Sequence, residues 1–550
     1  MLRTPPLLNS HSPVPTTQDQ KYDVIIIGAG FSGISALHRF RNQSLHSHIF
    51  EAGSDFGGAW HCNRYPGARV DSETPFYQLS IPEVYNTWTF SSRFPDHHEL
   101  RRYMAHIDKA LGLRRDTTFN ARVCGCTWDN SIADWTIRTE SGVTARSRWL
   151  VLATRLLHKP YTPSWPGKAN YKGLLIHPAQ WNEGIRVKGK KVAIIGGGAT
   201  SVQLTQELGK QASHLTLLVR RPSYCLPMVQ KTWSPDEITA FRDNLPVLLA
   251  AARASAVGIP NTRLNKRAQD VPTEERESYF EEIWAAGGMQ FLLRNYNNIM
   301  LDKEANELVY EFWKKKVRQR LTDCKKQALM ARDEMSFYFS TKRTPLEQDY
   351  YDVLNQENID ILDLKDCGIR GFTERGLQLG DQEREFDCIV CATGFDSITG
   401  SVTSMGLKNK HGVDIKDVWQ DGVRTYLGMM VHGFPNAFMV YSRQAPNALA
   451  NGPTVIECQC DFACDTIVRL GMNKIIEPTR EAEEGWKEGI DVSTSRTLYP
   501  HTDSWWNTSN VPGKKAENQL YILGISNYEK QCRETMDGWK GFVVSDVASP

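Results

Sequence analysis

Two glycine-rich turns mark the places where this chain could bind nucleotides. The first, "GAGFSG", spans residues 28–33 and follows the apolar run "VIII", and the second, "GGGATS", spans residues 196–201 and follows "VAII". In the first turn Gly28 permits the sharp bend, Gly30 lets the backbone approach a pyrophosphate, and Gly33 allows the helix to pack closely on the strand. The helix that begins in each turn then offers free N–H groups to the phosphates.

The charge at the end of the next strand distinguishes the two turns. Glu51 follows Gly28 by 23 residues, whereas Arg220 and Arg221 follow Gly196 by 24 and 25 residues. A carboxylate accepts hydrogen bonds from a ribose hydroxyl and repels a 2′-phosphate, whereas arginine side chains bind phosphate. The first turn is therefore predicted to hold FAD and the second NADPH, with a solvent-facing arginine pair as the alternative. In the second turn Gly198 stands at the middle position, and Ser201, which is also expected to contact the cofactor, replaces the third glycine.

These turns have to be positioned by two strand–turn–helix units, which predicts an α/β fold with two Rossmann-like dinucleotide-binding domains. The runs "LVLATRLL" at 150–157 and "REFDCIVCATGFD" at 384–396 are predicted to cross between the units and to act as a hinge. The NADP domain is then inserted in the FAD domain. We expect a disordered tail at 1–20 and an FAD domain divided into 21–155 and 391–550. The inserted NADP domain is expected at 156–390, and it carries a polar helical insertion at 230–340 that forms a lid or wall.

Composition argues against several other classes of protein. The net charge of +2 over 550 residues gives no reason to expect a nucleic-acid partner. The stretch 245–259 is too short to span a membrane and contains Arg253, so it is expected to be a packed helix rather than an amphipathic cover over an entrance. The 12 cysteines do not predict a disulfide framework or a metal site, even at Cys460 and Cys464. We expect a cytoplasmic monomer or weak homo-oligomer.

The segment "YKGLLIHPAQWN" at 171–182 resembles a family signature. It is similar to F-x-G-x-x-x-H-x-x-x-W-[P/D] of type I Baeyer–Villiger monooxygenases, with its Gly173, His177 and Trp181 intact. The resemblance runs from residue 21 onward and includes "NRYPGARVDSE", "STKRTPLEQDYY", "CATGFD", "TLYPHTDSWW" and "NVPGK". The runs "LIHPAQW" and "QAPNALANGP" are most similar to members that accept large or polycyclic ketones.

The resemblance implies an activity and a set of site residues. NADPH would reduce FAD, O₂ would react with the reduced flavin, and one oxygen atom would enter a ketone to give an ester or lactone. By matching motifs, Arg343 corresponds to the active-site arginine and Asp71 to the aspartate that positions it. Lys342 corresponds to a 2′-phosphate contact, and Trp505 to a residue of the loop over the nicotinamide.

Further cofactor contacts follow from the same matching. Arg69 is expected beside the nicotinamide end. Other contacts are expected in the two nucleotide sites at Gly58, Trp60, Tyr77, Val123, Ala199 and Thr200. His177 is expected to orient the linker ahead of the second turn, although the near-neutral pKa of histidine keeps a role as a base open.

Departures from the family pattern leave alternatives open. Arg155 replaces a usual glycine, and Ser442-Arg443 replaces a usual Gly-Pro, both near the expected flavin and substrate. They indicate either an unusual substrate or a degenerate flavoprotein without activity. A monooxygenase that oxidises nitrogen or sulfur would need both turns but not Arg343. A disulfide reductase is disfavoured because no redox cysteine pair follows the first turn.

Overall fold

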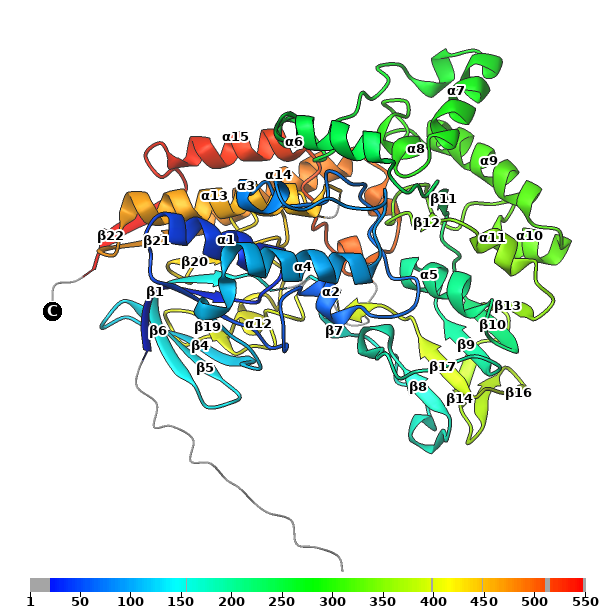
Figure 1. Ribbon diagram of the computed structural model, residues 1–550, viewed down its shortest axis with the longest axis horizontal. Helices are drawn as coiled ribbons and strands as arrows, with labels where there is room; N and C mark the ends of the chain where they lie inside the picture. Colours follow the sequence, from blue (N-terminus) through cyan, green and yellow to red (C-terminus); the bar gives the residue numbers. More distant parts are fainter. Residues whose placement is uncertain (1–19, 155, 397–398, 448, 510–514, 548–550) are drawn as a thin grey trace, which may run out of the picture.

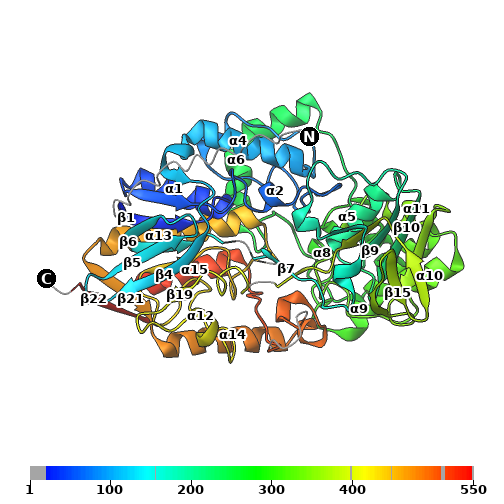
Figure 2. The same cartoon turned by 90° about the horizontal axis from the view of Figure 1, so that it is seen from below.

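The computed structural model describes residues 20–154, 156–396, 399–447, 449–509 and 515–547. Two sheets organise the chain, and both views place them on opposite sides of the molecule (Figures 1 and 2). The predicted tail lies outside the described residues except for Gln20, which begins the first strand. Arg155 and all of "NVPGK" also lie outside them.

The first sheet has eight strands and is built from two separate parts of the chain. Its order is β19-β4-β5-β6-β1-β2-β3, and β20 also pairs with β6. β1 runs parallel to both β2 and β6, which is the arrangement expected around a dinucleotide turn. The strands are β1 (Gln20–Ile27), β2 (Ser47–Phe50), β3 (Thr117–Thr118), β4 (Val123–Asp129), β5 (Asp134–Thr139), β6 (Thr144–Leu152), β19 (Leu407–Lys408) and β20 (Ala437–Met439).

The second sheet has five parallel strands in the order β13-β10-β9-β17-β8. All five lie in sequence between the two parts of the first sheet, so the predicted insertion of one α/β unit into the other is confirmed. The strands are β8 (Leu174–Ile176), β9 (Lys191–Ile195), β10 (His214–Val219), β13 (Ile359–Asp363) and β17 (Cys388–Cys391). β11 (Leu226–Pro227) and β12 (Leu346–Glu347) form a smaller two-stranded sheet, as do β21 (Lys474–Pro478) and β22 (Phe542–Asp546). A three-stranded sheet consists of β14 (Ile369–Phe372), β15 (Gly376–Leu379) and β16 (Gln382–Glu385).

The two chain crossings between the sheets lie side by side. β7 (Lys159–Pro160) pairs antiparallel with β18 (Phe395–Asp396). His177 joins them to the second sheet: the Ala179 N–H donates to its Nδ1 at 3.2 Å, which leaves Nε2 to donate to the Gly394 carbonyl at 2.9 Å. Burial lowers the pKa of His177, so the ring is neutral. Both ring nitrogens are therefore used in holding the linker, as the expected orienting role requires.

Helices begin where the turns and caps dictate. α1 (Phe31–Asn42) and α5 (Ala199–Leu208) start directly after Gly30 and Gly198, and α1 packs on α13 (Gly452–Leu470). The others are α2 (Ala59–Cys62), α3 (Pro82–Tyr85), α4 (His97–Leu111), α6 (Pro235–Ala254), α7 (Thr273–Ala285), α8 (Gln290–Leu293), α9 (Lys303–Arg320), α10 (Cys324–Met330), α11 (Tyr350–Leu354), α12 (Ile415–Val418), α14 (Arg480–Ser495) and α15 (Ile525–Met536). None of the helices that the structure describes has the length and apolarity that a membrane span requires.

The helical insertion touches both halves of the molecule. α6 packs on α15, and Arg253 of α6 pairs with Asp461 of α13 at 2.6 Å and with Glu529 of α15 at 2.8 Å. α7, α8 and α9 lie instead above the second sheet in the view of Figure 1. Leu245 and Leu249 are buried, so the part of the stretch 245–259 that lies in α6, up to Ala254, is a packed helix, as expected.

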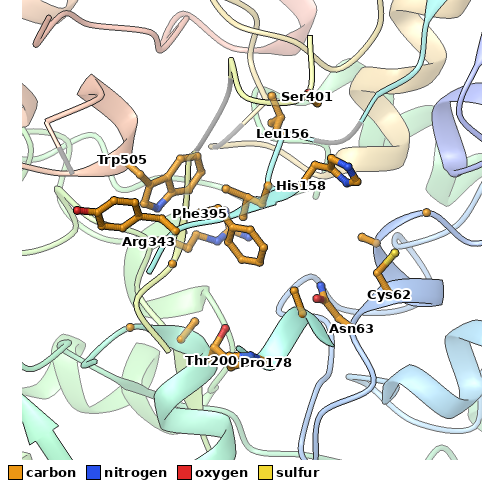
Figure 3. Close-up of a pocket in the computed structure, with 18 of the residues that line it drawn as sticks. Cys62, Asn63, Leu156, His158, Pro178, Thr200, Arg343, Phe395, Ser401 and Trp505 are labelled. Atoms are coloured by element: carbon orange, nitrogen blue, oxygen red, sulfur yellow. The ribbon is translucent and has the colours of Figure 1, made fainter. Parts of the chain in front are cut away.

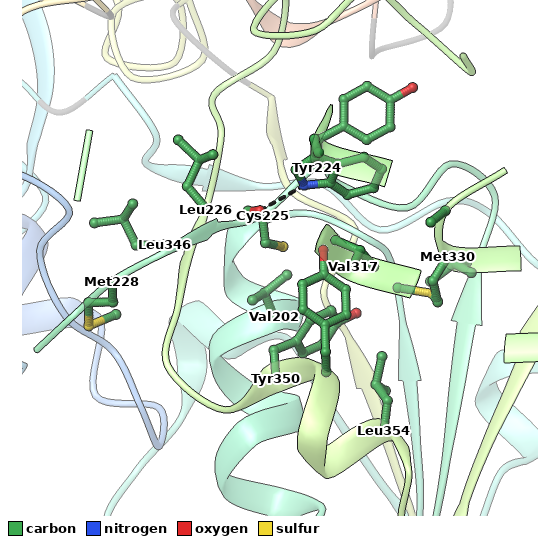
Figure 4. Close-up of a cluster of buried hydrophobic side chains, with 14 of the residues drawn as sticks. Val202, Tyr224, Cys225, Leu226, Met228, Val317, Met330, Leu346, Tyr350 and Leu354 are labelled. Carbon is green, nitrogen blue, oxygen red and sulfur yellow. Dashed lines mark hydrogen bonds between the residues drawn. The ribbon is translucent and has the colours of Figure 1, made fainter. Parts of the chain in front are cut away.

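A buried cluster fixes the chain just after the arginine pair of the second unit. Tyr224, Cys225 and Leu226 are buried between α5 and the insertion (Figure 4). The Trp313 indole N–H donates to the Cys225 carbonyl at 2.9 Å, and the Tyr224 hydroxyl donates to the Phe337 carbonyl at 3.0 Å. This packing holds the end of β10, and with it the arginines, in a defined position.

Candidate active site

A cavity of about 1520 Å³ lies between the two sheets. It is lined by Gly28 and Gly196, which directly follow β1 and β9, and by Ala153 and Ala392, which follow β6 and β17. Open α/β sheets bind ligands at the carboxyl ends of their strands. Pockets that bind one drug-sized ligand measure roughly 300–1,000 Å³, so this cavity offers room for more than one ligand.

Most of the predicted site residues meet in this cavity. Two of them, Gly33 and Ser201, do not line it. A Cβ atom on Gly33 would lie 1.9 Å from the Gly28 carbonyl oxygen, so this glycine serves the packing of α1. Ser201 is fully buried in α5 and does not reach the cavity, in contrast to the expectation that it contacts a cofactor. The residues that line the cavity are Gly28, Gly30, Glu51, Gly58, Trp60, Arg69, Asp71, Tyr77, Val123, Gly196, Gly198, Ala199, Thr200, Arg220, Arg221, Lys342, Arg343 and Trp505.

The first turn presents backbone N–H groups and one carboxylate. Glu51 accepts hydrogen bonds from the Ala29 and Gly53 N–H groups, each at 2.6 Å, and this fixes its carboxylate at the turn. Gly30 and Gly58 face each other so closely that a Cβ on Gly58 would lie 2.9 Å from the Gly30 Cα. The cavity wall at the first turn therefore consists of backbone without side chains, which suits a pyrophosphate, and the Glu51 carboxylate beside it suits a ribose hydroxyl, as FAD requires.

The second turn lies beside three cations. Arg220, Arg221 and Lys342 line one part of the cavity, and Asp503 pairs with Arg221 at 3.8 Å. Burial and the two arginines together lower the pKa of Lys342 to about 7, although Asp503 opposes this shift. The Lys342 ammonium also lies 4.6 Å from the centre of the Phe337 ring. A cluster whose cations repel one another is suited to an anion with more than one charge, such as a 2′-phosphate.

An ion pair in the cavity wall joins the two units. Nε and Nη2 of Arg343 donate to the two carboxylate oxygens of Asp71 at 2.7 and 2.8 Å, although the residues are 272 positions apart. Burial alone would raise the pKa of Asp71, but Arg343 outweighs it and the pKa is lowered. Burial likewise opposes the charge of Arg343, yet Asp71 holds the pKa of this guanidinium above its usual value. Arg343, whose side chain is 30% exposed, is thus a half-buried, permanently charged cation. Figure 3 shows it near Trp505 and across the cavity from Asn63.

Two further lining residues escaped the sequence analysis. Gln203, on the first turns of α5, accepts a hydrogen bond from the Tyr65 hydroxyl at 2.8 Å and donates to the Arg69 carbonyl at 3.1 Å. It therefore ties the loop of the first unit to the helix of the second. Tyr441 donates to the Asn447 carbonyl at 2.8 Å. No local motif indicates the role of Gln203, because it depends on contacts between units.

The unusual Arg443 lies away from the cavity. It is only 2% exposed, does not line the cavity, and its guanidinium lies 5.9 Å from the centre of the Trp419 ring. The expectation that it lies near the substrate is therefore not met. Among the described residues, no group of three or more acidic, histidine or cysteine side chains could hold a metal ion.

Comparison with known proteins gives consistent matches. A model of the flavin-binding monooxygenase-like family matches residues 21–269. The FAD-binding monooxygenase acrE of Aspergillus aculeatus is 38% identical over 95% of this chain and 89% of its own length. The cyclopentanone 1,2-monooxygenase of Comamonas is 37% identical over 96% of each chain. The crystal structure of cyclohexanone monooxygenase from Rhodococcus bound to NADP⁺ superposes with a TM-score of 0.93 at 30% identity, covering 96% of this chain and all of that one.

Proposed function

Because this chain belongs to the type I Baeyer–Villiger monooxygenases, within the flavin-binding monooxygenase-like family, we propose that its substrate is a bulky cyclic ketone. The enzyme uses FAD and NADPH and converts a ketone to an ester or lactone. One oxygen atom of O₂ enters the product, the other leaves as water, and NADPH supplies the two electrons. The observation that supports this oxygen insertion is the Asp71-paired Arg343 in a cavity that both glycine turns line. The bulk of the ketone is inferred from the runs "LIHPAQW" and "QAPNALANGP", which are most similar to family members that accept large or polycyclic ketones.

The cofactors would divide the cavity according to the charge of its walls. When bound, FAD supplies the redox centre that accepts hydride from NADPH and reacts with O₂. The proposed FAD contacts are Gly28, Gly30, Glu51, Gly58, Trp60, Tyr77 and Val123. The proposed NADPH contacts are Arg69, Gly196, Gly198, Ala199, Thr200, Arg220, Arg221, Lys342 and Trp505. Residues 21–155 and 391–550 would form the FAD domain, and residues 156–390 the NADP domain.

The chain's own groups would stabilise charge and exclude water. Arg343 is a preorganised cation, and negative charge that develops on oxygen during transfer would be stabilised by it without reorganisation of solvent. Asp71 keeps this guanidinium charged and holds its orientation through the two hydrogen bonds. Trp60 and Tyr77 are joined by a 3.1 Å hydrogen bond and add an apolar wall. All twelve cysteines are free thiols, which supports a cytoplasmic location.

The proposed activity is tested directly by product analysis. The purified yellow protein is incubated with NADPH, ¹⁸O₂ and a panel of small, bulky and polycyclic ketones. We expect an ester or lactone that contains one ¹⁸O atom, with the highest kcat/KM on the bulky cyclic ketones. Sulfoxide from a sulfide in the same panel without any ester would favour heteroatom oxidation. Bound flavin with no product from any substrate would favour a degenerate flavoprotein.

NADP⁺ binding is expected to weaken as the pH rises above about 7. The pKa of Lys342 is about 7 in the free protein, and a bound 2′-phosphate would raise it by favouring the charged amine. Binding above this pH must therefore take up a proton, and affinity should fall by up to about tenfold per pH unit. The pH range of the test has a lower limit because the 2′-phosphate takes up a proton and loses charge when the pH falls below its pKa of about 6. Titration of binding between about pH 7 and 8.5 measures the slope.

Two controls isolate Lys342 in this experiment. NAD⁺ lacks the 2′-phosphate, so its affinity should stay nearly flat over the same range. Lys342→Arg keeps its charge at every pH tested and should remove the slope for NADP⁺. A slope of the same size for NAD⁺, or one that persists in Lys342→Arg, would show that another group titrates.

A further inference from the structure

The C-terminal segment of residues 499–507 contributes an acidic side chain to the cation cluster. Asp503 Oδ2 lies 3.8 Å from Nη1 of Arg221, and both residues line the cavity. The Asp503 side chain is 71% exposed, so it stands at the rim, whereas Arg221 is 22% exposed. This carboxylate comes from a part of the chain nearly 300 residues beyond the arginines that it faces.

Hydrogen bonds on both sides hold Asp503 at this place. The hydroxyls of Thr502 and Thr341 lie 2.7 Å apart, and Thr341 directly precedes Lys342. On the other side, Ser504 Oγ accepts from the Trp506 N–H at 3.2 Å and caps the short helix Trp505–Asn507. The same few residues therefore place Asp503 beside the cations and Trp505 in the cavity.

The charges of the cluster determine how Asp503 responds to a ligand. Arg220, Arg221 and Lys342 carry up to three positive charges, and the Asp503 carboxylate neutralises one of them. A 2′-phosphate carries between one and two negative charges near neutral pH and would be attracted to the same cations. The Asp503 carboxylate and the 2′-phosphate would repel each other and would both be attracted by the same cations, so each weakens the binding of the other to the cluster.

We infer that Asp503 is a specificity-determining positioning residue whose carboxylate competes with the 2′-phosphate of the cofactor for Arg221. In the free enzyme Asp503 holds segment 499–507 on the cluster. Occupation of the phosphate subsite loosens this anchor, and the carboxylate in turn limits how tightly NADP(H) is held. The inference rests on the proposed 2′-phosphate role of the cluster.

Two adenosine fragments separate the phosphate effect from nicotinamide contacts. Adenosine 2′,5′-bisphosphate carries the 2′-phosphate, and 5′-AMP lacks it. In the FAD-loaded enzyme, Asp503→Asn should bind the bisphosphate about 2- to 5-fold more tightly, as expected for one partly exposed charge pair, and 5′-AMP unchanged. Asp503→Glu should retain the wild-type affinities. Glu488→Gln, which removes an exposed carboxylate from α14, serves as the control for net charge and should change neither affinity.

Hydrogen exchange measures the anchor independently of affinity. The bisphosphate should speed amide exchange in peptides that cover 499–507 of the wild-type enzyme, whereas 5′-AMP should not. In ligand-free Asp503→Asn these peptides should exchange faster than in the ligand-free wild-type enzyme. Addition of the bisphosphate to this variant should not increase their exchange rate further. Unchanged bisphosphate affinity in Asp503→Asn, or slower exchange in the wild type when the bisphosphate binds, would overturn the inference.

The failure of the inference and that of the proposed phosphate site are distinguishable. Arg221→Ala should weaken the bisphosphate selectively if the cluster binds the 2′-phosphate. An equal effect on both fragments would remove the phosphate site itself, and the inference with it. A selective loss in Arg221→Ala, combined with unchanged affinities in Asp503→Asn, would overturn only the role of Asp503.

Discussion

Arg343→Ala should abolish oxygen insertion while NADPH still reduces the bound flavin. The guanidinium lines the cavity and is held by the two hydrogen bonds that it donates to Asp71 of a second segment. Loss of one preorganised group that stabilises developing negative charge lowers rates by about 10²- to 10³-fold. The loss should be at the upper end here, because the substitution also leaves the half-buried Asp71 carboxylate without its partner.

Two measurements separate the chemical role of Arg343 from a general loss of structure. Anaerobic stopped-flow absorbance reports flavin reduction, and product mass under O₂ reports ester formation. Arg343→Lys keeps the charge but not the paired hydrogen bonds and should recover only part of the insertion rate. Arg384→Ala removes an arginine that pairs with Asp360 at 2.9 Å outside the cavity, and insertion should continue. Ester formation near the wild-type rate in Arg343→Ala would refute the assigned role.

Arg220→Ala combined with Arg221→Ala should weaken NADPH far more than NADH. Each arginine offers charge-assisted hydrogen bonds to a 2′-phosphate, and such bonds contribute about 1.5–3 kcal/mol apiece. The double variant should therefore lose about 10²-fold or more in kcat/KM for NADPH. NADH lacks the phosphate, so its kcat/KM should change by less than about threefold, as expected for altered surface charge alone.

The matched control removes two adjacent cations elsewhere. Lys315 and Lys316 of α9 pair with Glu277 and Glu281 outside the cavity. Lys315→Ala with Lys316→Ala should leave the preference for NADPH intact, although it makes the same change in net charge. An equal loss for NADPH and NADH in the arginine variant would mean that the pair contacts some other part of the cofactor.

Features set by short stretches of chain were predictable from the sequence. Both glycine turns, the strand before each and the contrast between Glu51 and Arg220 lie within units of about 25 residues, where local geometry dictates the position of each residue. The nesting of one unit in the other also followed from the two apolar crossings. Ser201 shows the limit even here: it holds the third-glycine position, where close helix packing was expected, and it lies buried in α5 without reaching the cavity at which a cofactor contact was also expected.

The family resemblance implied that Asp71 positions Arg343, but the spacing of the two residues along the chain gave no reason to expect it. Their hydrogen bonds join residues 272 positions apart, and Asp503 approaches Arg221 from a still more distant segment. The lowered pKa of Lys342 arises only when burial and two arginines surround it. Spacing along a chain specifies strands, turns and helices, whereas burial and charge pairing depend on how separate units pack against each other. The sequence by itself therefore determined the two nucleotide-binding units and their charge preference, and the tertiary structure decided the environment in which their side chains would act.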